Sequence, residues 1–471
     1  MANIVVLGAG VAGHTAAAYL QKGLNKNEHK IKVISPTPNY QWIPSNIWVG
    51  VGRMTPEEIK FDLRPLYKKW GIEFIQAKAQ SFYPEGDEHM NTGFVEVEYT
   101  NEENKGEKIK VAITHDSRIN NTLFAMTTAD VFTANGIEVM YFREMRPTPM
   151  LSFAVRHFGC KSGVMITASH NPKEYNGYKA YWEDGAQVVA PHDENIIKEV
   201  QKITSFEQVN WNKQDELIHY IEEDFDAIYL DLVKELSLSK DAIQAQKSMP
   251  IVFSPIHGAS GKMVPAALKA FGFENIQVVK EQAEPDGNFP TVIYPNPEEA
   301  EALTLAVALG QKVGAALVLA CDPDGDRYAA VVPNELGEYE LLNGNQTGTL
   351  LVYYLLSRRK ELGLAKSTDF MVNTIVTTEL INKIAEGFGV PCYNVLTGFK
   401  NIASIILQKE GKETFIAGGE ESFGFLVGDF VRDKDGVSAC ALVAEAVAYY
   451  KTQGKTVFAV LAEVYQRFGF Y

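Results

Sequence analysis

Cysteine is scarce in this chain of 471 residues, which contains only four. Cys160, Cys321, Cys392 and Cys440 lie far apart, and none stands in a CxxC pair or in the spacing of a zinc site. The chain also lacks an apolar run long enough to span a membrane. Its first residues lack the basic segment that opens a signal peptide. We therefore predict reduced thiols, no membrane span and a cytoplasmic location.

Positive charge is in short supply as well. The sequence has 44 Lys and Arg residues against 59 Asp and Glu residues, which gives a net charge of -15. This balance argues against nucleic acid as the main partner. A sugar phosphate needs only a local basic pocket, so the overall acidity does not exclude such a substrate. The length is enough for about three or four domains, and the repeated alternation of strand and helix patterns predicts an α/β fold.

One short stretch, Thr-Ala-Ser-His-Asn-Pro at residues 167–172, follows an apolar run at 163–166 that reads as a strand. Its serine, Ser169, stands between small and turn-forming residues, so its hydroxyl can face a substrate. The same residue types also dominate ordinary solvated turns. Two later stretches decide between these interpretations.

The first is an acidic loop that follows the apolar run at 315–320. Its carboxylates, Asp322, Asp324 and Asp326, occupy alternating positions. At roughly 5 Å and an effective dielectric constant near 20, each pair would repel by about 3 kcal/mol, which a divalent cation removes. An all-oxygen site suits Mg²⁺. An EF-hand loop is excluded, because the glycine of this loop stands fourth instead of sixth and a proline takes the place of the final glutamate.

The second is a glycine-bounded loop at 418–424, which follows a strand-like run at 414–417. It contains Glu420 and Ser422, a carboxylate and a hydroxyl that suit the vicinal hydroxyl groups of a sugar. Taken alone, this loop is a weak signal.

In this order and spacing, the three stretches resemble the alpha-D-phosphohexomutase family (phosphoglucomutase/phosphomannomutase), from about residue 108 to residue 471. The resemblance implies a phosphoserine at Ser169 and Mg²⁺ held by Ser169, Asp322, Asp324 and Asp326. It also implies a mutase that moves a phosphoryl group between C1 and C6, or C5, of a sugar phosphate, with glucose 1,6-bisphosphate as activator.

The same resemblance assigns the remaining site residues. The catalytic groups would be Ser169, His170, Lys179 and Arg327, and the substrate-binding groups Arg118, Gly398, Lys400, Glu420, Ser422, Arg432 and Lys434. For His170 the competing interpretation is a purely local hydrogen bond, and for Arg432 and Lys434 it is a surface charge cluster. Gly424 stands where some hexomutases carry a histidine. With the Thr-Gly-Phe-Lys pattern at 397–400, this favours the branch that includes phosphopentomutase-like enzymes, so the substrate stays open between hexose and pentose phosphates.

The first 107 residues follow another pattern. An apolar run at 4–7 and a helical pattern at 14–22 flank a GxGxxG turn whose glycines are Gly8, Gly10 and Gly13. In this setting a helix N-terminus can bind the pyrophosphate of a dinucleotide. Ser35, however, stands where an acidic residue would bind the ribose. With residues 40–52, this segment resembles the start of the FAD domain of sulfide:quinone oxidoreductases.

That second resemblance makes FAD a candidate cofactor and an FAD-dependent oxidoreductase an alternative function. Against it, residues 1–107 contain no cysteine, and the later flavin-binding segments of that family have no counterpart. A catalytically inert hybrid of the two families is the third hypothesis.

The predicted fold is therefore α/β, with a partial Rossmann-like FAD-type segment followed by three phosphohexomutase-type domains. We expect the segment at 1–107, a seam between 101 and 110, and domains at 108–204, 205–338 and 339–471. Relative to the family, the first domain would lack its N-terminal part and the fourth domain would be missing. We expect weakened turnover, and an exposed apolar face on a terminal helix near 458–468.

Overall fold

The computed structural model describes residues 2–9, 11–25, 29–41, 60–83, 94–99 and 109–471. The chain divides into two compact units, residues 1–108 with 190–195, and residues 109–189 with 196–471. In the described part of the chain, no helix combines the length and the apolar character that a membrane crossing requires.

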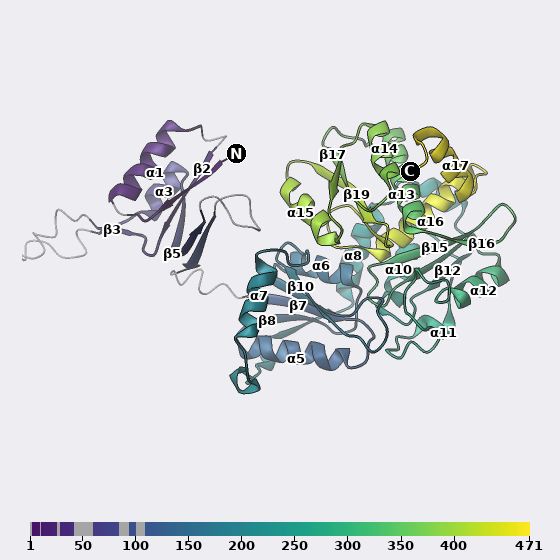
Figure 1. Cartoon of the computed structure of the whole chain (residues 1–471), viewed down its shortest axis with the longest axis horizontal. Coiled ribbons are helices and arrows are strands. Elements are labelled where there is room, and N and C mark those ends of the chain that lie inside the picture. Colours follow the sequence, from purple (N-terminus) through teal and green to yellow (C-terminus); the bar gives the residue numbers. More distant parts are fainter. Residues whose placement is uncertain (1, 10, 26–28, 42–59, 84–93, 100–108) are drawn as a thin grey trace, which may run out of the picture. The chain divides into compact units, whose positions relative to one another are not determined.

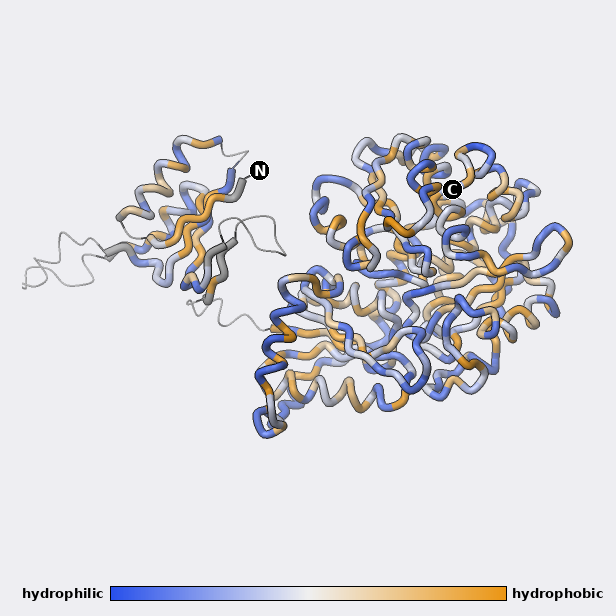
Figure 2. Tube along the Cα trace, in the orientation of Figure 1, coloured by the Kyte–Doolittle hydropathy of each residue, from blue (hydrophilic) through white to orange (hydrophobic). Residues whose placement is uncertain are grey.

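The smaller unit contains a four-stranded sheet in the order β1-β2-β5-β6. Strands β1, β2 and β5 are parallel, and β6 is antiparallel to β5. Buried side chains such as Ala17, Val33 and Tyr67 form its core, and Figure 2 shows hydrophobic residues along its strands. The elements are β1 (Ala2–Leu7), α1 (Val11–Gly23), β2 (His29–Ser35), β3 (Asn39–Gln41), β4 (Lys60–Asp62), α3 (Arg64–Trp70), β5 (Glu73–Tyr83) and β6 (Phe94–Tyr99).

The predicted strand and helix on either side of the glycine motif are present at the start of this unit, as β1 and α1. Gly8 has a φ of +92°, and a Cβ atom at Gly13 would lie 1.9 Å from the carbonyl oxygen of Gly8. Only glycine at position 13 therefore lets α1 approach the end of β1 this closely. Gly10, residues 42–52 of the flavoprotein resemblance and most of the predicted seam lie outside the described residues.

The larger unit begins with a five-stranded sheet in the order β10-β9-β7-β8-β11. All its strands are parallel except β10, which is antiparallel to β9. Helices α5 and α6 lie on opposite faces of this sheet (Figure 1). The elements from residue 110 to residue 221 are β7 (Lys110–His115), α5 (Asn121–Ala134), β8 (Glu138–Phe142), α6 (Thr148–His157), β9 (Ser162–Ile166), β10 (Tyr178–Trp182), α7 (His192–Gln201), η2 (Phe206–Gln208), η3 (Asp215–Leu217) and β11 (Ile218–Ile221).

A second five-stranded sheet has the order β13-β12-β14-β15-β16. Its central strand β14 is buried along its whole length, which explains the continuous apolar run in the sequence. The acidic loop joins β14 to the antiparallel β15. The elements are α8 (Asp224–Glu235), α9 (Lys240–Ala245), β12 (Ile251–Ser254), η4 (Ala259–Gly261), α10 (Met263–Phe271), β13 (Ile276–Val278), α11 (Lys280–Ala283), α12 (Thr304–Val313), β14 (Leu317–Cys321), β15 (Tyr328–Pro333) and β16 (Tyr339–Leu342).

A third, four-stranded sheet has the order β18-β17-β19-β20. Helix α16 is buried along most of its length, because it packs against α9, α10, β14 and β15 of the preceding layer as well as β20 of its own. The elements are α13 (Gly344–Glu361), β17 (Asp369–Thr374), α14 (Glu379–Phe388), β18 (Cys392–Val395), α15 (Phe399–Lys409), β19 (Thr414–Glu420), β20 (Gly424–Val427), α16 (Gly436–Thr452) and α17 (Val457–Phe468).

The expectation of an exposed apolar face on the last helix is wrong. In α17, Leu461 and Val464 are buried, and the helix packs against α13 and α14. The ring of Phe468 lies so close to Gly387 in α14 that a Cβ atom there would approach it to 2.5 Å. The terminal helix therefore completes the core of the third layer.

Candidate active site

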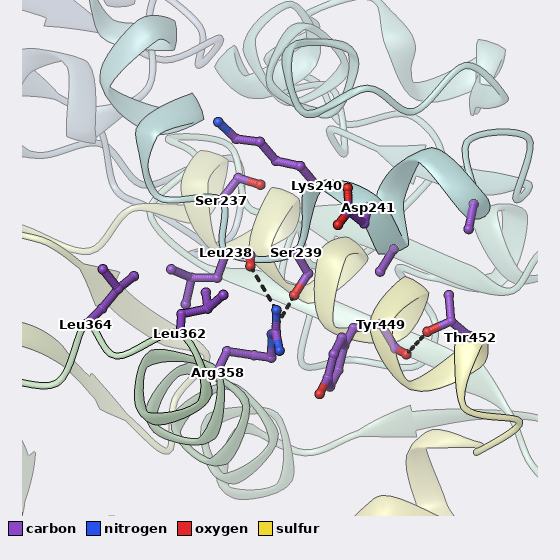
Figure 3. A pocket seen from close by; sticks show the side chains of 12 residues that line it. Ser237, Leu238, Ser239, Lys240, Asp241, Arg358, Leu362, Leu364, Tyr449 and Thr452 are labelled. Atoms are coloured by element: carbon purple, nitrogen blue, oxygen red, sulfur yellow. Dashed lines mark hydrogen bonds between the residues drawn. The ribbon is translucent and has the colours of Figure 1, made fainter.

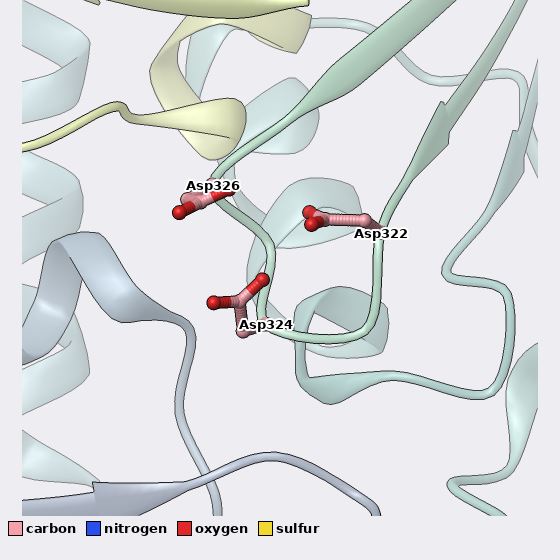
Figure 4. Close-up of side chains that lie close together, drawn as sticks. All are labelled: Asp322, Asp324 and Asp326. Carbon is pink, nitrogen blue, oxygen red and sulfur yellow. The ribbon is translucent and has the colours of Figure 1, made fainter. Parts of the chain in front are cut away.

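The acidic loop places its three carboxylates together. Asp322, Asp324 and Asp326 each offer an oxygen atom, and these atoms all lie within 4.8 Å of one another. Figure 4 shows the three side chains leaving one tight loop. Gly325, with a φ of +68°, makes the turn possible. The carboxylates are almost completely buried, so this is an enclosed cluster of negative charge.

The electrostatics of this cluster fit a divalent cation. Burial and the neighbouring carboxylates of Asp324 and Asp326 raise the pKa of Asp322 well above its usual value. Burial also opposes ionisation of Asp326, yet Lys179, Lys434 and Arg327 lower its pKa. Asp324 Oδ1 and Asp326 Oδ1 are buried and accept no hydrogen bond from the described residues. Unsatisfied carboxylate oxygens of this kind suit Mg²⁺.

Ser169 reaches this cluster from the end of β9. Its Oγ donates a hydrogen bond of 2.7 Å to Asp322 Oδ2 and lies 3.2 Å from His170 Nδ1. The backbone of Ser169 is left-handed, with a φ of +51°, which few residues other than glycine adopt without strain. The structure thus brings the predicted phosphoserine and the predicted metal loop together.

Arg118 holds the serine loop in this conformation. Its guanidinium donates to the carbonyl oxygens of Ser169 and Asn171 at 2.6 Å and of Pro172 and Tyr175 at 2.9 Å. The side chain is buried and pairs with Asp116 at 3.4 Å. The predicted substrate contact of Arg118 gains no support from this geometry, because these donors are committed to the loop.

Two lysines and an arginine surround the carboxylates. From β10, Lys179 Nζ lies 2.7 Å from Asp324 and 3.3 Å from Asp326, and Lys434 Nζ lies 3.2 Å from Asp326. Burial alone would lower the pKa of both lysines, but the neighbouring carboxylates raise it, so both remain ammonium groups. The backbone N–H of Arg327 donates to Asp322 at 3.0 Å, and its guanidinium pairs with Glu298.

The imidazole of His170 is neutral near pH 7. Its burial, and then the charge of Arg327, lower its pKa to about 4. A neutral imidazole next to Ser169 Oγ can accept a proton or a hydrogen bond. This arrangement is compatible with both interpretations of His170, a catalytic group and a purely local hydrogen bond.

The glycine-bounded loop at 418–424, which we call the sugar loop, meets the 397–400 loop at the end of β19. Glu420 Oε1 accepts a hydrogen bond of 2.8 Å from the backbone N–H of Gly398, whose φ of +110° requires glycine. Burial raises the pKa of the Glu420 carboxyl. Lys400 lies in the first turn of α15, and Ser422 in the turn between β19 and β20.

Arg432 is placed differently from the other predicted binding residues. Its side chain is 1% exposed and pairs with Glu410 at 2.7 Å, and it also donates to the carbonyl oxygen of Asp429 at 3.1 Å. It is therefore neither part of an exposed charge cluster nor open to solvent.

Sequence reasoning missed several residues that shape the site. Thr148 Oγ1 donates to Asp324 Oδ2 at 3.1 Å, and its backbone N–H donates to the carbonyl oxygen of Asp324 at 2.8 Å. In the sequence, Thr148 marks only the start of a helix. Asp433 and Tyr181 form a buried hydrogen bond of 2.7 Å between the first and third layers. No local pattern links two residues so far apart in the chain.

A cavity of about 550 Å³ lies elsewhere in the larger unit. Figure 3 shows Arg358 directed toward Leu238 and Ser239 in this cavity, where it donates at 3.4 Å to the carbonyl of Leu238 and at 2.9 Å to the Ser239 hydroxyl. The cavity contains none of the site residues predicted from the sequence. We therefore assign the candidate site to the carboxylate cluster.

Comparison with known families agrees with this site. Models for phosphoglucomutase/phosphomannomutase, alpha/beta/alpha domains I, II and III, match residues 87–207, 227–337 and 343–468. The chain belongs to the phosphoglucomutase/phosphomannomutase family. Its fold is mixed α/β with three domains of this family's type. The predicted domain limits at 108, 205 and 339 stay predictions.

Individual relatives cover most of the chain but only part of their own length. Human phosphopentomutase is 35% identical over 358 residues, which cover 74% of this chain and 58% of that protein. A phosphoglucomutase from Staphylococcus haemolyticus is 34% identical over 368 residues, with 78% and 66% covered. A protein from Thermus thermophilus, described as a phosphomannomutase, superimposes with a TM-score of 0.63 at 25% identity, covering 77% and 76%.

The comparisons do not show the flavoprotein resemblance of residues 1–107. The first family match starts at residue 87. The parallel strands of the smaller unit and the close approach of Gly13 to Gly8 are established, whereas dinucleotide or FAD binding there stays a prediction.

Proposed function

We propose that this chain is a phosphosugar mutase in which Ser169 carries the transferable phosphoryl group. The observation that carries the proposal is the 2.7 Å hydrogen bond between Ser169 Oγ and Asp322. It joins a hydroxyl on a strained, tightly held loop to a cluster of buried carboxylates. The kinship with phosphopentomutase and phosphoglucomutase supports the same assignment.

The proposed reaction has two halves. Phosphoserine 169 donates its phosphoryl group to a free hydroxyl of a sugar monophosphate. A sugar O–P bond forms as the serine O–P bond breaks, and the proton of the sugar hydroxyl ends on the Ser169 oxygen. The resulting bisphosphate turns over in the site, and its other phosphoryl group returns to Ser169. Such transfers depend mainly on positioning and on stabilising the charge of the moving group.

The side chains around Ser169 divide these tasks. Lys179 and Lys434 lie beside the carboxylates, which raise their pKa, so we assign both ammonium groups as positive charges for the phosphoryl oxygens. His170 is neutral and 3.2 Å from Ser169 Oγ, so it can take or return a proton at that atom. Mg²⁺, which Asp322, Asp324 and Asp326 would hold, neutralises charge on a phosphoryl oxygen when bound.

The proposed substrate is a hexose or pentose monophosphate. Glu420, Ser422, Gly398 and Lys400 lie on the two loops that would bind its hydroxyl and phosphate groups, with Glu420 already fixed by Gly398. The relatives include both a phosphopentomutase and a phosphoglucomutase. Glucose 1,6-bisphosphate is the proposed activator, because it can phosphorylate Ser169, and a cytoplasmic location suits these soluble metabolites.

Intact mass spectrometry tests the proposal. The full chain is incubated with glucose 1,6-bisphosphate and Mg²⁺, and we expect a gain of one phosphoryl group that peptide mapping places at Ser169. The Ser169→Ala variant should gain none. A folded, unmodified chain that takes up no phosphoryl group would contradict the proposal and favour an inert hybrid.

The oxidoreductase alternative has its own test. Gly13 in α1 lies close to the carbonyl oxygen of Gly8, and this close approach is the feature that favours a bound dinucleotide. A flavin absorption spectrum in the purified full chain would support this alternative. A colourless protein that takes up a phosphoryl group at Ser169 would reject it.

A further inference from the structure

Asp433 is a buried carboxylate whose oxygen atoms are fully used. Oδ2 accepts hydrogen bonds from the Tyr181 hydroxyl at 2.7 Å and from Gln187 Nε2 at 2.9 Å. Oδ1 accepts from the backbone N–H of Lys434 at 2.8 Å and from its Nζ at 3.2 Å. Asp433 is 1% exposed and these four donors occupy its oxygen atoms, so its influence passes through its partners.

The first partner, Lys434, is fixed between two carboxylates. Its Nζ lies 3.2 Å from Asp433 Oδ1 and also 3.2 Å from Asp326 Oδ2, and it lies 5.4 Å from the centre of the Phe399 ring. The stem of the side chain passes directly over Gly424, where a Cβ atom would lie 2.1 Å from Lys434 Cδ. The head group therefore depends on Asp433 for one of its two anchoring charges.

The second partner, Tyr181, connects Asp433 to the strand that carries Lys179. Residues two apart on a strand point to the same face, so Lys179 and Tyr181 leave β10 on one side. Tyr181 donates to Asp433 while Lys179 pairs with Asp324. Asp433 thus tethers the strand from which the other ammonium group reaches the carboxylates.

We propose that Asp433 is a positioning residue for phosphoryl transfer: it fixes the ammonium group of Lys434 directly and supports that of Lys179 through Tyr181. The proposal rests on the proposed function of the Ser169 site. Without the charge of Asp433, Lys434 keeps a single carboxylate partner, Asp326, which is itself a predicted metal ligand. The ammonium group then moves toward Asp326 and away from the position in which it faces a phosphoryl group.

Asp433→Asn tests the role with almost no change in shape. Phosphoryl uptake by Ser169 from glucose 1,6-bisphosphate and Mg²⁺ is followed in single-turnover experiments on the full chain. We expect the maximal rate constant to fall about 10- to 100-fold, because the contact between the Lys434 ammonium group and a charged carboxylate becomes a contact with a neutral amide. The half-saturating concentration should change less than about threefold, because the contact acts mainly on the transferring group. Asp433→Glu, which restores the charge, should recover part of the loss.

Asp435→Asn is the matched control. Asp435 is also a buried aspartate, but its partners are the backbone N–H groups of Val437 and Ser438 and the Tyr229 hydroxyl, and an asparagine can still cap helix α16 there. Its rate constant should stay within about threefold of the unmodified chain. Tyr181→Phe leaves the Asp433–Lys434 contact intact. Its rate constant should lie between those of Asp433→Asn and Asp435→Asn.

A double-mutant cycle separates positioning from general support. In a Lys434→Met background, Asp433→Asn should reduce the rate constant by less than about threefold, because its main target is gone. Additive losses, or equal losses from Asp433→Asn and Asp435→Asn, would overturn the inference. No uptake by the unmodified chain would overturn the proposed function and the inference together. Equal uptake by the unmodified chain and Asp433→Asn would overturn the inference alone.

Discussion

The hydroxyl of Ser169 donates a 2.7 Å hydrogen bond to the carboxylate of Asp322, which is 153 positions further along the chain. Ser169 follows β9 of the first sheet, and Asp322 follows β14 of the second. The loop after a parallel strand in each sheet therefore forms one half of the site. Thr148, which binds Asp324 through both its side chain and its backbone, fixes the same junction.

Removing one carboxylate of the acidic cluster should weaken metal binding. Asp324→Asn takes away a charge, and with it the buried Oδ1 that accepts no hydrogen bond from the described residues. We expect the affinity for Mg²⁺, measured by isothermal titration calorimetry, to fall at least about 10-fold. Asp231→Asn, at an exposed position, is the control and should bind like the unmodified chain. Equal affinities for all three proteins would contradict a metal site at this loop.

Arg118 should matter through the shape of the serine loop. In Arg118→Lys the charge remains, but an ammonium group cannot reach the four carbonyl oxygens that the guanidinium fork contacts. We expect faster amide hydrogen exchange at residues 169–175 and a fall of about 10- to 100-fold in phosphoryl uptake.

Arg143→Lys is the control for this substitution. Arg143 is half exposed and pairs with Glu222, so both measurements should stay close to those of the unmodified chain. Unchanged exchange in Arg118→Lys would show that the loop does not depend on the guanidinium.

A single methyl group at position 424 should disturb Lys434. In Gly424→Ala the new Cβ would lie 2.1 Å from Lys434 Cδ and 2.9 Å from its Cγ, so the lysine must move. We expect a destabilisation of about 1 to 3 kcal/mol by denaturant unfolding and a loss of phosphoryl uptake as large as that of Lys434→Met.

Gly348→Ala is the matched control in helix α13, where the new Cβ would meet only Ile381 Cδ1 at an ordinary 3.4 Å and Phe425 Cε2 at 4.0 Å. There alanine should stabilise the chain by up to about 1 kcal/mol. A Gly424→Ala variant as stable and active as Gly348→Ala would show that the Lys434 side chain can move aside without loss of stability or phosphoryl uptake.

Local features of the fold could be predicted from the sequence. The strand expected at 163–166 is part of β9, and the helical pattern at 14–22 lies within α1, because each is defined by a pattern within a few residues. Asp322, Asp324 and Asp326 could be found for the same reason, since one tight loop carries all three. The pairing of this loop with Ser169 follows only from the family resemblance.

Contacts between distant segments could not be predicted in this way. Tyr181 and Asp433 are 252 positions apart, and nothing near either residue indicates the other. From the sequence, the apolar face of α17 is predicted to be exposed. It is in fact covered by α13 and α14, which lie far earlier in the chain. The sequence predicts Arg118 to be a substrate contact, but its guanidinium donates to four backbone carbonyl groups. Every residue has a backbone carbonyl, so a sequence does not indicate which of them a side chain contacts.

The pH dependence of stability offers a last test, at Asp116 beneath the serine loop. Burial raises the pKa of Asp116 to about 6 from a usual value of 3.8, although Arg118 opposes the change. The folded chain therefore binds this proton more tightly than the unfolded chain does. The stability it contributes is complete below about pH 4 and is lost as the pH rises through about 6.

Asp116→Asn removes this titration. The difference between protonated Asp116 and an asparagine adds an offset that is the same at every pH, so the signal is the change between pH values. The difference between about 6 and 3.8 corresponds to about 3 kcal/mol. From about pH 4 to about pH 7, the unmodified chain should lose up to that much stability relative to Asp116→Asn. Thermal midpoints of the two proteins that keep a constant separation over this range would show that Asp116 is ionised throughout, because Arg118 and the hydrogen bonds then outweigh its burial.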